Sequence, residues 1–74
     1  MKGQLEIYSS MKIWKARELI DLIESDGWFL ARQKGSHKHF RHPSKQGTVT
    51  IPYSGNDDIP PGTAISILKQ AGLK

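Results

Sequence analysis

The chain of 74 residues contains no cysteine. Folds held together by disulfides and zinc sites built from thiolates are therefore excluded. No apolar run approaches the about 18 consecutive residues that a membrane-spanning helix needs. The N-terminus also lacks the hydrophobic core of a signal peptide, so the sequence predicts a cytoplasmic protein with no membrane partner.

Negative charge is missing from one long stretch of the chain. Between Arg32 and Lys45 there are five Lys or Arg and three His, but no carboxylate. Most acidic residues lie elsewhere, in residues 18–26 and at 57–58, and the whole chain carries a net charge of +4. This segregation indicates that a polyanion such as a nucleic acid would meet the basic segment first.

The length and composition predict one small folded domain. Hydrophobic residues make up 36% of the chain and charged residues 24%, as in ordinary soluble folds. Residues 1–10 differ from the rest: Leu5 and Ile7 alternate weakly, which fits a short edge strand. We favour the simpler interpretation that residues 1–10 are an extension ahead of an alternative start at Met11, followed by a domain over 11–74.

Apolar residues at helical spacing predict two helices. The first spans about 14–26, ends at Gly27, and has an apolar stripe of Ala16, Leu19, Ile20 and Ile23. The second is expected to be capped by Asp58 or Thr63, with Pro60 and Pro61 tolerated in its opening turn. Its apolar stripe consists of Ala64, Ile67, Leu68 and Ala71, and Gly72 followed by Leu73 predicts a Schellman ending.

Three strands are predicted between the helices, over residues 28–33, 37–42 and 48–51. Trp28 and Leu30 are expected on one face of the first strand, and Pro52 is expected to end the pairing of the third. The order α-β-β-β-α predicts an α+β fold. Two helices would cover one face of a three-stranded antiparallel sheet, as in the double-stranded-RNA-binding fold, and leave the other face exposed.

Alternation along the second strand separates its polar residues. Phe40 is the obvious core residue, so Lys38 and His42 nominally share its face. His37, His39 and Arg41 then point to the opposite, open face. Thr48 and Thr50 of the third strand would lie beside them, giving a shallow polar platform and not an apolar pocket.

This platform has the groups that RNA cleavage requires. Imidazole both accepts and donates protons near neutral pH, and RNA supplies its own nucleophile, the 2′-OH. The backbone N–H groups of Lys34-Gly35-Ser36 are suited to an anion nest. Because no carboxylate cluster suggests a magnesium site, we expect cleavage without metal or cofactor that leaves a 2′,3′-cyclic phosphate.

Segments spread from Met11 to the C-terminus carry a resemblance to a known family. They are Arg17-Glu18-Leu19-Ile20, Asp26-Gly27-Trp28, Gly35-Ser36-His37-Lys38-His39-Phe40 with His42-Pro43, Gly47-Thr48-Val49-Thr50-Ile51-Pro52, Ile59-Pro60, Gly62-Thr63 and Ile67-Leu68-Lys69-Gln70-Ala71-Gly72-Leu73. In order and spacing they resemble the HicA family of messenger-RNA-cleaving toxins. Two segments depart from that resemblance: residues 1–10 have no obvious counterpart, and residues 53–58 lack the positive charge that the family often has there.

The resemblance implies a toxin of double-stranded-RNA-binding-like fold that arrests growth by cleaving mRNA and is held inactive by a HicB-like antitoxin. In that family the His of the Gly-Ser-His turn is catalytic, which corresponds to His37 here. The predicted RNA contacts are Arg32, Lys34, Lys38, His39 and Arg41, with Gly35 and Ser36 shaping the turn.

Other interpretations of the same residues stay open at this point. A non-catalytic RNA-binding module would use the same basic face, and a protein-interaction module would need neither RNA nor catalysis. His39 fits either a phosphate contact or an ordinary exposed residue, and His42 fits a structural role. A zinc site at His37 and His39 lacks a third ligand. Trp28 and Phe40 fit the core better than a base-stacking role, whereas Phe29 fits either.

Overall fold

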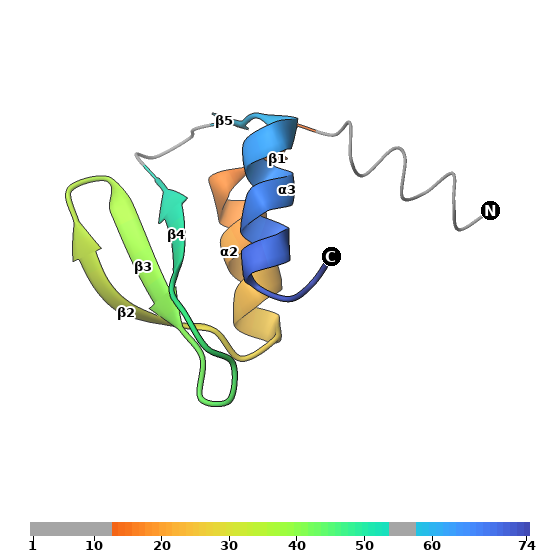
Figure 1. Ribbon diagram of the computed structural model, residues 1–74. Coiled ribbons are helices and arrows are strands. Elements are labelled where there is room, and N and C mark those ends of the chain that lie inside the picture. Colours follow the sequence, from red (N-terminus) through yellow and green to blue (C-terminus); the bar gives the residue numbers. More distant parts are fainter. Residues whose placement is uncertain (1–12, 54–57) are drawn as a thin grey trace.

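The computed structural model describes residues 13–53 and 58–74. In chain order the elements are β1 (Trp14–Lys15), α2 (Ala16–Ser25), β2 (Phe29–Lys34), β3 (His37–Arg41), β4 (Val49–Pro52), β5 (Asp58–Ile59) and α3 (Pro61–Gln70) (Figure 1). Strands β2, β3 and β4 form an antiparallel sheet in that order. The predicted α+β fold with two helices is confirmed. The extension predicted for 1–10 and residues 54–57 of the charge-altered loop lie outside the described residues.

Helix α2 has the predicted buried stripe and the predicted end. Its four apolar residues Ala16, Leu19, Ile20 and Ile23 are all buried. After Asp26, Gly27 takes a φ of +108°, and Trp28 N–H donates to Ile23 O (3.1 Å), which is the Schellman hydrogen bond. A Cβ on Gly27 would lie 2.8 Å from Nε2 of His42, so both the backbone angle and the close neighbour require glycine.

Helix α3 begins differently from the prediction. Pro60 is the N-cap residue, with Pro61 in the first turn and no side-chain cap, so the expected caps Asp58 and Thr63 are wrong. Proline is tolerated there because the first helical N–H groups have no partner within the helix. The far end agrees with the prediction, since Leu73 N–H donates to Leu68 O (2.8 Å) beyond a left-handed Gly72.

A two-residue ladder between β1 and β5 was not predicted. Trp14 pairs with Ile59, and Lys15 pairs with Asp58. The first helix therefore starts at Ala16 and not at Trp14. Asp58, which was expected in a polar loop, belongs to a strand. Burial of Ile59 fixes this pairing, and Lys15 Nζ donates to Asp58 Oδ1 at 2.5 Å. Two residues are too few to show a strand period in the sequence.

The core lies between the two helices and the sheet. Its buried sheet residues are Phe40, Val49 and Ile51, and Trp28 packs beside them, which confirms the core role predicted for Trp28 and Phe40. Strand β2, by contrast, is exposed along its whole length because it forms a free edge of the sheet. Leu30 therefore shares the face of Phe40 but stays 43% exposed. No helix within residues 13–53 and 58–74 is long and apolar enough to cross a membrane.

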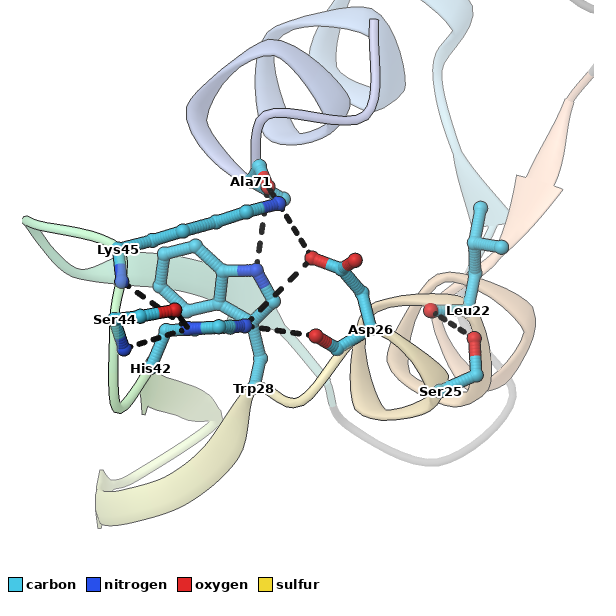
Figure 2. Close-up of polar contacts among 8 residues, drawn as sticks. All are labelled: Leu22, Ser25, Asp26, Trp28, His42, Ser44, Lys45 and Ala71. Carbon is cyan, nitrogen blue, oxygen red and sulfur yellow. Dashed lines mark hydrogen bonds and ion pairs between the residues drawn. The ribbon is translucent and has the colours of Figure 1, made fainter.

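A cluster of polar contacts ties the two helix ends to the β3–β4 connection (Figure 2). Lys45 Nζ donates to Asp26 Oδ2 (2.5 Å) and to Ala71 O (2.9 Å), and the indole N–H of Trp28 donates to the same carbonyl (3.2 Å). His42 stacks edge-on against Trp28 at 5.3 Å. We call Asp26, Trp28, His42, Lys45 and Ala71 the helix-end cluster. Lys45, although part of the basic segment, is thus used to hold the fold together.

The hydrogen bonds of His42 fix its tautomer and confirm its structural role. Backbone N–H groups of Ser44 (3.0 Å) and Lys45 (3.1 Å) both donate to Nδ1, so that nitrogen carries no proton. Nε2 therefore carries the proton and donates to Asp26 O (2.7 Å).

We expect Asp26→Asn to lower stability at neutral pH and to flatten its dependence on acid. The hydrogen bond from the Lys45 ammonium, above all, lowers the pKa of the Asp26 carboxyl below its ordinary value of 3.8. The stabilisation of the folded state by ionised Asp26 is therefore complete above pH 3.8, the ordinary pKa of the carboxyl. It disappears as the pH falls through the lower pKa of Asp26 in the folded state. Urea midpoints measured from neutral pH into acid check this. A variant that loses stability in acid as steeply as the unmodified chain would contradict it.

Candidate nucleic-acid interface

The strand register places the predicted polar residues on one face of the sheet. Directly paired residues share a face, and the pairs are Lys34 with His37, Arg32 with His39, and Phe29 with Arg41. On the other side of β3, His39 pairs with Thr50 and His37 with Pro52. The face opposite the helices therefore carries both histidines and Arg41, as predicted from the alternation about Phe40.

A β-bulge in β2 adds Arg32 to this open face. Leu30 pairs with Phe40 and Arg32 with His39, so one residue of β2, Ala31, has no counterpart on β3. With strict alternation Arg32 would lie on the face of Leu30, toward the helices. The extra residue reverses that parity and turns the guanidinium toward His39. In the sequence Arg32 is distinguished only by its charge, and no residue of β2 indicates the bulge that positions it.

A hollow of about 440 Å³ occupies the middle of the open face. Its lining residues come from all three strands of the sheet and from the residue before β4: Ala31, Arg32, His39, Arg41, Thr48 and Thr50. His39 is half-buried there, and its Nδ1 lies 2.9 Å from Thr50 Oγ1. Two guanidinium groups around one half-buried imidazole form a site for an anion with hydrogen-bonding oxygens.

His37 lies beside this hollow, at the hairpin end of the same face. It is the first residue of β3 and is exposed, and alternate residues of a strand are about 7 Å apart. Gly35 has a φ of +58° while Ser36 keeps a negative φ, the pattern of a type II′ hairpin turn. Side-chain and backbone bonds hold the turn: Gln33 Nε2 donates to Gly35 O (3.1 Å), and Tyr53 N–H to Ser36 O (2.5 Å).

That last bond corrects the prediction for Pro52. Pairing between β3 and β4 continues through Pro52, opposite His37, and on to Tyr53. Proline is accommodated because β4 is an edge strand within the three-stranded sheet, where one missing N–H is tolerated. The pairing of Pro52 and Tyr53 with β3 and its turn fixes the backbone at His37.

Lys38 is the predicted contact that the structure places elsewhere. It pairs with Gln33 and Ile51 on the face of the helices, its Nζ donates to Gln33 Oε1 (3.2 Å), and it lies 5.2 Å from the centre of the Tyr53 ring. Phe29, in contrast, is 51% exposed on the open face opposite Arg41. An aromatic side chain in that position is suited to stacking with a nucleotide base.

Among the residues that pair on the open face, all the charged side chains are basic. Arg32, Lys34 and Arg41 accompany the two histidines, and no carboxylate shares these register positions. Within residues 13–53 and 58–74, no three His, Cys, Asp or Glu side chains gather as metal ligands. The arrangement can bind a phosphate backbone and transfer protons beside it.

Comparison with protein families gave a match over most of the chain. The model described as the HicA toxin of bacterial toxin–antitoxin systems matches residues 16–73, which is most of the chain. The match runs from Ala16, the first residue of α2, to Leu73, three residues beyond the end of α3, so it includes the whole three-stranded sheet and its open face. No curated protein matches the chain.

Proposed function

Because the chain belongs to the HicA family of toxins from bacterial toxin–antitoxin systems, we propose that it is an endoribonuclease that cleaves mRNA in the cytoplasm. Membership of the family implies an antitoxin partner. We propose that this partner is a HicB-like protein that holds the nuclease inactive. The growth arrest of a toxin then follows from loss of messages.

One observation carries the proposal: on the open face, Arg32 and Arg41 line one hollow with the imidazole of His39, and the imidazole of His37 lies beside it. Guanidinium binds phosphate oxygens through two parallel hydrogen bonds, which positions as well as attracts the anion. A shallow face admits a flexible single strand, in which the 2′-OH can reach the geometry for in-line attack. Phe29 at the margin of this face supports the same class of ligand.

In the proposed mechanism His37 takes the proton of the 2′-OH. The bond from O2′ to phosphorus forms as the bond from phosphorus to O5′ breaks. O5′ takes up a proton as it leaves, which gives a 2′,3′-cyclic phosphate and a free 5′-OH. Arg32 and Arg41 hold the non-bridging oxygens and stabilise the charge that develops on them. Lys34 extends the cationic surface at the turn, and Gly35 and Ser36 offer backbone N–H groups there.

The test is incubation of the purified chain with RNA, with and without a chelator, followed by analysis of the new ends. We expect cleavage in both conditions and 2′,3′-cyclic phosphate on the upstream fragment. Tight, salt-sensitive binding that leaves the RNA intact would instead favour the non-catalytic RNA-binding module. Absence of both binding and cleavage, with tight capture of the antitoxin alone, would favour a protein-interaction module.

We expect Arg32→Ala combined with Arg41→Ala to weaken RNA binding and to reduce its dependence on salt. Each phosphate contact that is lost lowers the slope of log K against log salt by about 0.7 for a single strand. Titrations of fluorescent RNA at several salt concentrations measure both effects. Arg17→Ala is the matched control, because Arg17 is an exposed arginine on α2, paired with Asp21 (3.4 Å) and remote from the open face. Lys38→Ala should weaken binding less than the double variant, and an equal loss would contradict the assignment of the face.

A further inference from the structure

The three histidines of the described chain differ in what their ring nitrogens face. Nδ1 of His42 accepts from two backbone N–H groups and is held without a proton. Nδ1 of His39 faces the Thr50 hydroxyl at 2.9 Å. A hydroxyl either donates or accepts, so this contact persists whether the His39 ring is neutral or protonated. His39 can therefore gain and lose a proton without breaking the bond that orients it.

The same bond fixes which nitrogen of His39 remains for a ligand. With Nδ1 on Thr50, Nε2 is the nitrogen available in the hollow lined by Arg32 and Arg41. Half-burial and a side-chain contact across the strand give this ring a defined position, as a proton-transfer group needs. The charged groups that face it are Arg32 and Lys34 of β2 and His37 and Arg41 of β3. On the other side, Thr50 of β4 and Thr48, which precedes β4, are uncharged. An anionic phosphodiester between the guanidinium groups offsets their repulsion of a protonated ring.

His37 and His39 stand at alternate positions of β3 and share the open face, about 7 Å apart along the strand. In an in-line displacement the attacking and leaving oxygens lie on opposite sides of phosphorus. Two imidazoles that flank one phosphate can therefore each reach one of these oxygens. A single exposed imidazole can serve only one of them at a time.

We propose that His39 is the general acid of the cleavage, an assignment that rests on the ribonuclease function proposed above. Nε2–H of protonated His39 gives its proton to O5′ as the P–O5′ bond breaks. His37 accepts the proton of the 2′-OH as the O2′–P bond forms. One proton is taken up and one is released, and the two rings then exchange protons with water to restore their starting states.

The test compares two substrates that differ in one atom. After the wild-type cleavage site has been mapped, an oligonucleotide is made with that site, and a second with sulfur in place of the 5′-bridging oxygen. A thiolate leaves without being protonated, so general-acid catalysis no longer matters. We expect His39→Ala to lose about 100-fold or more on the oxygen substrate but to stay within about fivefold of wild type on the sulfur substrate. Thr50→Val, which removes the orienting hydroxyl, should show the same pattern more weakly.

The comparison separates the possible failures. Equal losses of His39→Ala on both substrates would overturn the assignment and leave His39 as a binding or structural residue. Sulfur rescue of His37→Ala instead of His39→Ala would overturn it by reversing the roles. A wild-type chain that leaves RNA intact, so that there is no cleavage site to map, would refute the ribonuclease function itself. Poor folding of a variant lowers both activities together, so it cannot mimic the expected rescue.

Discussion

We expect His37→Ala to abolish RNA cleavage and to preserve most RNA binding. Removing a group that transfers protons in the transition state costs about 100- to 10,000-fold in rate. The arginines of the hollow, Arg32 and Arg41, remain in place to bind the phosphate. RNA integrity after brief induced expression, together with growth, measures the loss in cells. Purified protein with a mapped oligonucleotide measures it as a rate, and titration of the same oligonucleotide measures binding.

Because of its position, His37 can be replaced by alanine with little expected effect on the fold. The side chain is exposed at the start of β3, and the turn before it is held by backbone bonds that alanine keeps. The variant should therefore fold and unfold as the unmodified chain does, which circular dichroism checks. Growth arrest that persists in the variant would remove His37 from the mechanism. Loss of binding in proportion to cleavage would make it a binding residue only.

The face of the sheet was predictable because one residue set the parity of β3. Phe40 is the only large apolar side chain between His37 and Arg41, so its burial decides where its neighbours point. The buried stripes of the helices were predictable for a similar reason, because apolar residues repeated with a period near 3.6 all lie on one side of a helix. Each helix also ends at a glycine that adopts positive φ, namely Gly27 and Gly72.

What the sequence did not reveal depends on contacts between distant residues. The bulge at Ala31 is set by the pairing of Leu30 with Phe40 and of Arg32 with His39, and no residue type in β2 marks it. The β1–β5 ladder joins segments more than 40 residues apart through Lys15 and Asp58. Such features depend on which segments pack against each other in the folded chain. A single sequence does not show this where the alternation of apolar and polar residues is too short to identify a strand.

The helix-end cluster is the clearest case of a residue whose role changed. Lys45 counts as one more cation of the basic segment in the sequence, yet its ammonium is bound by Asp26 and by Ala71 O. Asp26, whose carboxylate binds the ammonium, is the C-cap residue of α2, and Ala71, whose carbonyl oxygen binds it, is the C-cap residue of α3. Of the five Lys and Arg in the basic segment, Lys45 is held at the helix ends and Lys38 lies on the face of the helices, so three remain on the open face.

Trp28→Ala should leave the domain barely folded. Trp28 is 2% exposed, its indole N–H donates to Ala71 O (3.2 Å), and its ring is the platform for His42. Truncating a buried tryptophan costs about 3–5 kcal/mol. A domain of this size has a total stability of only about 4–11 kcal/mol, at about 0.05–0.15 kcal/mol per residue. Urea denaturation followed by circular dichroism measures the change, and loss of the folded baseline at low urea is within the expected range.

Two neighbouring variants locate the cause of that loss. Trp28→Phe keeps most of the apolar contact but removes the donor to Ala71 O, a hydrogen bond worth about 1 kcal/mol, so it should fall between wild type and the alanine variant. Phe29→Ala truncates the adjacent aromatic residue, which is 51% exposed on the edge strand, and should change stability by no more than about 0.5 kcal/mol. Since Trp28 joins the ends of both helices through Ala71 and the helix-end cluster, its removal loosens the sheet from its support. A Phe29 variant as unstable as Trp28→Ala would show that β2, and not the helix ends, holds the open face in place.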